Sequence, residues 1–196
     1  EEPMDRPELI DGLKVAEHAP QPPQRCIGID PGLNRTGYAV LDPQSGGPVL
    51  LEAGLIRSTR GGSLAERVGE IGIGLREVLD EFSPGVLAIE QVFSLARNPK
   101  SAILMAHARG AILFAAVERE VEVVHYTPTQ VKKLLTGSGR ASKEQIQHVV
   151  QAEFKLERLP EPHDVADACA VGLCHVHTAT VTWKRTRLSG GNEEQR

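Results

Sequence analysis

The segment Arg25–Asp30 reads Arg-Cys-Ile-Gly-Ile-Asp, and Pro31 and Gly32 follow it at once. A short apolar run before two turn residues predicts a buried β-strand that ends at Asp30. A carboxylate at the edge of buried surface is costly unless a positive group meets it. On the residues alone, Asp30 is either an ordinary turn residue or a functional acid at the end of a strand.

Three further acids stand in apolar surroundings. Glu90 ends the run Val86–Glu90, although Glu is rare in strands and rarely buried, so the strand end either reaches solvent or carries a function. Asp164 and Asp167 are three residues apart and share a helix face. Asp164 also suits a helix start, whereas Asp167 lies within the apolar stretch Val165–Val171 and needs a partner. Carboxylates from such distant segments suggest one positive object, and a divalent cation pair fits best, as in a metal-dependent phosphodiester nuclease.

Three other residues are candidates for nucleic-acid contact. Phe93 lies three residues after Glu90 in a polar, basic segment, where it is either a core anchor or a ring that stacks on an unpaired base. Lys132 and Lys143 lie between the fifth predicted strand and the last acidic helix. Most lysines are merely solvated, yet phosphodiester cleavage needs cations near the phosphate.

The periodicity predicts an α/β fold with a mixed five-stranded sheet flanked by helices. Short loops join the first three strands and favour an antiparallel meander, and the later strand–helix–strand units favour parallel additions. If the first and fourth strands are parallel neighbours, Asp30 and Glu90 emerge at the same edge. Strands are expected at 25–30, 36–42, about 49–57, 86–91 and 121–126, and helices at about 64–82, 100–119, 128–135, 142–155 and 163–177.

The totals suit one domain with extensions. The chain has 196 residues, of which 40% are hydrophobic. Residues 1–24 include a Pro-rich linker and are expected to be a flexible extension, residues 25–178 the nuclease domain, and residues 179–196 a disordered polar tail. We expect a cytoplasmic protein without membrane association, since the sequence opens with no secretory signal and has no apolar run of about 18 residues.

Charge and cysteine content add little to this interpretation. The net charge of −4 argues weakly against nucleic-acid binding, but many acids lie within the first 17 residues. The three cysteines lack a zinc-type spacing and are expected to be small core residues.

The ordered set of motifs resembles the bacterial RuvC Holliday junction resolvases over about residues 25–178. The matching motifs are Gly28-Ile29-Asp30-Pro31-Gly32, Thr36-Gly37-Tyr38, Ala88-Ile89-Glu90-Gln91-Val92-Phe93, Ala108-Arg109-Gly110 and Ala166-Asp167-Ala168. The sequence departs from the family at Met105-Ala106-His107, where the family usually carries Gly-Gln.

The resemblance implies a ribonuclease H-like fold and paired, symmetric cuts in strands of like polarity at a four-way DNA junction. It implies two Mg²⁺ or Mn²⁺ ions bound by Asp30, Glu90, Asp164 and Asp167. It implies that Phe93 stacks on a base and that Lys132 and Lys143 are functional basic residues. It also implies a homodimer that acts with a branch-migration helicase, and the small residues Ala102, Ala106, Gly110 and Ala111 suit a helix face in such a dimer.

Three alternatives stay open. An actin-like or sugar-kinase-type ATPase shares a strand–Asp–Gly start, but 196 residues are few for two lobes around a nucleotide. A junction-binding module without catalysis would not need four carboxylates. A related nuclease could act on RNA or on RNA–DNA hybrids, and Phe93 and the dimer distinguish that case.

Overall fold

The computed structural model describes residues 22–91 and 99–190, and its centre is one five-stranded sheet. The strands are β1 (Cys26–Asp30), β2 (Arg35–Gln44), β3 (Gly47–Arg57), β4 (Val86–Glu90) and β5 (Glu122–Tyr126). Their order in the sheet is β3-β2-β1-β4-β5. β1, β2 and β3 form the predicted antiparallel meander, and β4 and β5 are added in parallel to β1. The predicted mixed sheet is confirmed.

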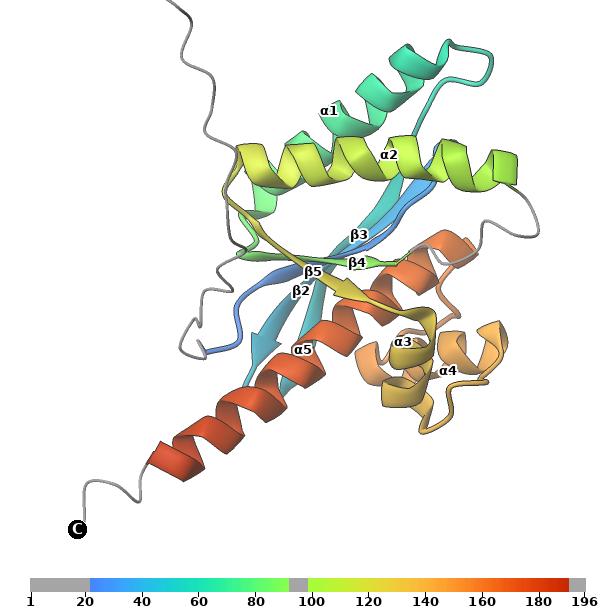
Figure 1. The fold of residues 1–196 in the computed structure, drawn as a ribbon. Coiled ribbons are helices and arrows are strands. Elements are labelled where there is room, and N and C mark those ends of the chain that lie inside the picture. Colours follow the sequence, from blue (N-terminus) through green and yellow to red (C-terminus); the bar gives the residue numbers. More distant parts are fainter. Residues whose placement is uncertain (1–21, 92–98, 191–196) are drawn as a thin grey trace, which may run out of the picture.

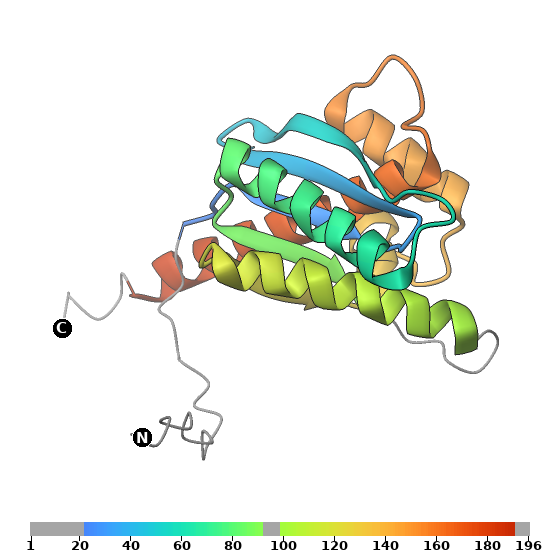
Figure 2. The ribbon, with the colours of Figure 1, turned by 90° about the horizontal axis from the view of Figure 1, so that it is seen from above.

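Helices cover both faces of this sheet (Figures 1 and 2). α1 (Leu64–Phe82) and α2 (Pro99–Glu118) lie on one face, where Ile71 and Ile112 pack against Ile27 of β1 and its neighbours. α3 (Pro128–Thr136), α4 (Lys143–Phe154) and α5 (His163–Gly190) lie on the other. The apolar side chains of β1 alternate between the two cores because successive strand residues point to opposite faces.

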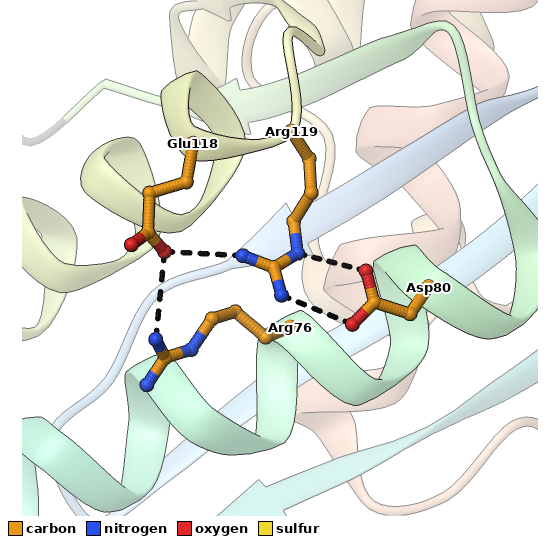
Figure 3. Close-up of polar contacts among 4 residues, drawn as sticks. All are labelled: Arg76, Asp80, Glu118 and Arg119. Atoms are coloured by element: carbon orange, nitrogen blue, oxygen red, sulfur yellow. Dashed lines mark hydrogen bonds and ion pairs between the residues drawn. The ribbon is translucent and has the colours of Figure 1, made fainter.

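Two salt-bridged arginines join α1 to α2 at the edge where β5 begins. Arg119 Nε and Nη2 donate to Oδ1 and Oδ2 of Asp80 at 2.8 and 3.0 Å, and Arg119 Nη1 lies 3.1 Å from Glu118 Oε2 (Figure 3). Glu118 also lies 3.5 Å from Arg76 of α1. The network links the two helices, but exposed ion pairs contribute little to stability, on the order of 0–1 kcal/mol each.

By length and hydropathy alone α2 could cross a membrane, the one such helix within the described ranges. The core helix of a soluble protein passes the same test. α2 buries Ile112, Ala115 and Ala116 against α1 and the sheet and carries Arg109 among its apolar residues. One face of α2 therefore packs on the core, and 28% of its apolar stretch is buried.

The last helix differs from the expectation. α5 runs to Gly190, so the predicted helix end near residue 177 is wrong, and so is the predicted disorder of residues 179–190. Thr178, Thr182 and Thr186 each donate a hydroxyl hydrogen bond to the carbonyl four residues earlier, at 2.7 to 3.1 Å. The end of α5 projects beyond the sheet (Figure 1).

The cysteines are confirmed as core residues. Cys26, Cys169 and Cys174 are free and buried. Burial raises the pKa of the Cys26 and Cys169 thiols to about 12, so they stay protonated.

Candidate active site

Two of the candidate acids end adjacent parallel strands. Ile29 of β1 pairs with Ile89 of β4, so Asp30 and Glu90 follow side by side at the carboxyl edge of the sheet. Both side chains are half-buried, because the hydrophobic strands that carry them are covered on both faces. The predicted shared edge is confirmed.

The start of α5 carries the other two acids to this edge. Gly37 pairs with Asp30 across β1 and β2, and a Cβ on Gly37 would lie 2.0 Å from the carbonyl oxygen of Asp164. A Cβ on Gly28 would lie 2.3 Å from the carbonyl oxygen of Ala168. Glycine at these two strand positions lets the helix backbone touch the sheet. Asp164 therefore lies beside Asp30, with Asp167 on the next turn.

The neighbouring carboxylates act on one another through their charges. Burial, together with the charges of Asp167, Glu90 and Asp164, raises the pKa of Asp30 to about 8, against the opposing effect of Lys143. Burial and the charge of Asp167 also raise the pKa of Glu90, against the opposing effect of Lys143 and Lys132. The site therefore favours bound positive charge.

Two basic side chains supply part of that charge. Lys143 Nζ donates to Asp167 Oδ2 at 3.0 Å, and this hydrogen bond raises the pKa of the lysine. Arg35 Nη2 lies 3.0 Å from Asp164 Oδ2, but the pair is not aligned as a hydrogen bond and this buried oxygen has no hydrogen-bond partner. Within the described ranges, no three Asp, Glu, His or Cys side chains are arranged so that they could hold a metal ion together.

The donor set nevertheless fits a hard divalent cation. All four side chains offer carboxylate oxygens, the ligands that Mg²⁺ and Mn²⁺ prefer, and Asp164 Oδ2 is buried without a hydrogen bond. A cation there would replace the contacts with Lys143 and Arg35 and would remove the repulsion around Asp30.

Both predicted lysines lie at the acidic cluster. Lys132 and Lys143 line a small hollow of about 190 Å³ together with Glu90 and Asp167. Val131, Pro128, Ile146 and Ala170 form its apolar wall. Phe93 lies outside the described residues, so its stacking role stays a prediction.

His175 and His177 of α5 have structural partners. His163 is exposed at the start of α5. His175 Nδ1 lies 3.1 Å from the Tyr126 hydroxyl, and His177 Nε2 lies 3.4 Å from Glu153.

Arg109 lies in the motif Ala108-Arg109-Gly110, and the sequence predicts no role for it. Its Nη1 donates to the backbone carbonyl of Glu90, and its Nη2 lies 2.7 Å from Nδ1 of His125 on β5. A guanidinium only donates, so Nδ1 accepts and the His125 ring is neutral, in keeping with a pKa lowered by burial and by Arg109. Arg109 thus ties the end of β4, and with it Glu90, to α2 and β5.

Comparison with known proteins agrees with this geometry. The family model for crossover junction endodeoxyribonuclease RuvC matches residues 26–175. The RuvC protein of Rhodopirellula baltica is 48% identical over 163 residues, covering 83% of this chain and 92% of that protein. The structure of Thermus thermophilus RuvC superposes with a TM-score of 0.75 at 34% identity, covering 81% of this chain and 96% of that one. The same protein in complex with a Holliday junction substrate gives a TM-score of 0.76 at the same identity and coverage. The chain therefore belongs to the RuvC family of crossover junction endodeoxyribonucleases.

Proposed function

We propose that this protein is a metal-dependent endonuclease that resolves four-way DNA junctions by paired, symmetric cuts in strands of like polarity, during recombination and repair. The observation that carries the proposal is the meeting of Asp30, Glu90, Asp164 and Asp167 at one sheet edge in a chain of the RuvC family. The T. thermophilus relative binds a Holliday junction substrate, which supports the same substrate class here.

The four carboxylates would hold two divalent cations, Mg²⁺ or Mn²⁺. Such ions would lower the pKa of the attacking water and would stabilise the negative charge that develops on the leaving oxygen. The protein's own part is to hold the oxygens in place: β1 and β4 fix Asp30 and Glu90, and the glycine contacts fix the start of α5. Arg109 fixes the backbone of Glu90.

Lys143 and Lys132 would meet the phosphate. Lys143 is bound to Asp167 at 3.0 Å, and both lysines lower the pKa of Glu90, so their charges are felt within the site. Once the charge of Asp167 is neutralised by a cation, the Lys143 ammonium is free to turn to a phosphate oxygen. A preset ammonium at this place stabilises the charge that develops during cleavage.

A second copy of this chain is the partner that α2 best fits. Ile103, His107, Gly110, Phe114 and Val117 are all exposed and follow one another at spacings of four and three residues. This is the spacing of a helix–helix seam, and an added Cβ on Gly110 would meet nothing within 4 Å. Of the small residues considered for the dimer, Ala106 and Gly110 are exposed, whereas Ala102 is buried and Ala111 is half-buried. A dimer through this seam would present two active sites to one junction.

Cleavage assays test the proposal directly. We expect a synthetic four-way junction to be cut at two symmetric positions with Mg²⁺ or Mn²⁺ and to stay intact with a chelator. Matched duplex and RNA–DNA hybrid should be cut far more slowly. Preferred cleavage of the hybrid would point to a nuclease of another specificity, and ATP binding without cleavage would favour the kinase-like alternative. Action with a branch-migration helicase follows from the family resemblance and stays part of the proposal, as does a cytoplasmic location.

A further inference from the structure

A second hollow lies on the β2–β3 side of the acidic cluster. It is open, has a volume of about 580 Å³, and adjoins the active site because Asp164 forms part of its wall. The lining residues are Gly32, Leu33, Asn34, Arg35, Arg57, Ser58, Arg60 and Asp164. Three of these eight are arginines and one is an acid. The hollow therefore carries net positive charge, whereas the site beside it is acidic.

Strand pairing brings two of the arginines to the catalytic edge. Arg35 begins β2 and Arg57 ends β3, and the two are partners in the antiparallel register. β1 runs antiparallel to β2, so the end of β1 at Asp30 lies at the same edge. The strands are about 4.8 Å apart. Arg57 therefore lies about 10 Å from the strand of Asp30, so one DNA strand that passes the acidic edge can also pass the hollow.

Hydrogen bonds make the rim of the hollow rigid. Ser58 Oγ donates to the carbonyl of Leu33 at 2.5 Å, and Ser58 N donates to the carbonyl of Asn34 at 3.3 Å. Arg67 of α1 donates to Ser58 Oγ at 3.2 Å and to the side-chain oxygen of Asn34. The turn after β1 is thereby tied to the end of β3 and to α1. A preset rim lowers the cost of binding a ligand.

The charge in the hollow is largely uncompensated. Arg35 is paired with Asp164, whereas Arg57 and Arg60 have no acidic partner within residues 22–91 and 99–190. All three arginines are exposed to solvent. Arginine presents a planar fork of donors that matches the oxygens of a phosphate.

We propose that Arg35, Arg57 and Arg60 form a phosphodiester-binding subsite, the arginine hollow, on the opposite side of the carboxylates from Lys132 and Lys143. It binds the backbone of the cleaved DNA strand to one side of the cleaved bond, so the strand is held on both flanks of the acidic centre. Arg35 is bound to Asp164 while the carboxylates lack a cation, and it turns to the phosphate when a cation takes the charge of Asp164. This inference rests on the proposed function.

Binding without cleavage tests the subsite. Affinity for a four-way junction is measured by fluorescence anisotropy in chelator, from about 50 to 200 mM salt, for the wild type and for Arg57→Gln, Arg60→Gln and the double variant. Each single variant should bind about tenfold more weakly at low salt, and its slope of log K against log[salt] should be less steep by about 0.9. Arg57→Lys should keep the slope. Lys184→Ala is the control, because it also removes one exposed positive charge. Lys184 lies about 30 Å from Asp164 along α5, so its loss should leave the affinity for the junction unchanged.

The outcomes separate the two proposals. A wild type that neither binds nor cuts the junction would overturn the proposed function. A wild type that does both, with a double variant of unchanged affinity and slope, would overturn the arginine hollow alone. An equal loss in Lys184→Ala would also overturn it, because the effect would then be one of total charge.

The exchange of Arg35 has its own readout. Mn²⁺ affinity is measured without DNA by electron paramagnetic resonance for the wild type and for Arg35→Gln. Removing the competing guanidinium should tighten Mn²⁺ binding severalfold while it weakens junction binding. Equal Mn²⁺ affinity in the two proteins would refute the exchange.

Discussion

Asp30→Asn should stabilise the metal-free protein, and the gain should grow with pH. Asp30 is held among three other carboxylates at a buried edge, and its pKa is raised from 3.8 to about 8. At neutral pH the folded protein must therefore bind a proton at this site or tolerate a charge that the unfolded chain carries without cost. An uncharged amide of the same shape avoids both.

The sign and size of the effect follow from proton linkage. Between pH 3.8 and about 8 the folded state binds a proton at Asp30 that the unfolded state does not. Stability from this group is complete below pH 3.8 and falls by at most about 1.4 kcal/mol per pH unit as the pH rises toward 8. From about pH 5.5 to 7.5 the wild type should thus lose up to about 2.7 kcal/mol relative to Asp30→Asn.

Urea unfolding in the presence of a chelator measures this difference. Glu157→Gln, at an exposed position outside the site, is the control and should follow the wild type at each pH. Adding Mg²⁺ should stabilise the wild type and have little effect on Asp30→Asn, since a ligand stabilises only the state that binds it. A difference between Asp30→Asn and the wild type that stays constant across the pH range would refute the coupling of these carboxylates.

Glu90→Gln should lower the rate of junction cleavage by more than about 100-fold, as measured by single-turnover cleavage. The affinity for the junction, measured by fluorescence anisotropy, should stay within about threefold of the wild type, because binding rests on phosphate contacts elsewhere. Arg109→Met should raise the Mg²⁺ concentration for half-maximal cleavage by about 10- to 100-fold, because Glu90 loses its support, whereas an unchanged metal requirement would contradict the positioning role. Phe114→Asp should give a monomer by sedimentation, since it places a charge in the proposed seam, and Leu188→Asp on the exposed end of α5 should not. Gly28→Ala should destabilise the fold by about 1–3 kcal/mol because its Cβ meets helix backbone at 2.3 Å, whereas Gly69→Ala in α1, with nothing within 4 Å, should be neutral or stabilising in thermal melts.

The position of the acids was predictable because it depends on local pattern. Strands that end in Asp30 and Glu90, with a three-residue spacing from Asp164 to Asp167, are visible in the sequence, and parallel pairing brings strand ends together. The three-residue spacing also reports a shared helix face. These signals need no knowledge of which distant side chains meet.

The two arginines of the site could not be assigned in the same way. Arg35 and Arg109 are two of many arginines, and their partners Asp164 and Glu90 are distant in sequence, so only the folded chain shows the contacts. The length of α5 was missed for another reason. Thr178, Thr182 and Thr186 have poor helix propensity, yet each hydroxyl bonds the carbonyl four residues before it within a helix anchored by its buried first half.

The long last helix also offers a practical handle. Asp164 lies in its first turn, and Leu188 lies about 36 Å farther along the same helix. The Leu188 side chain is 79% exposed. A fluorophore attached at position 188 would stand clear of the edge where DNA is expected to bind, yet would report every rotation of the helix that carries two of the acids. Single-molecule energy transfer from that dye to a labelled junction arm could then follow the approach of the enzyme in real time without crowding the chemistry.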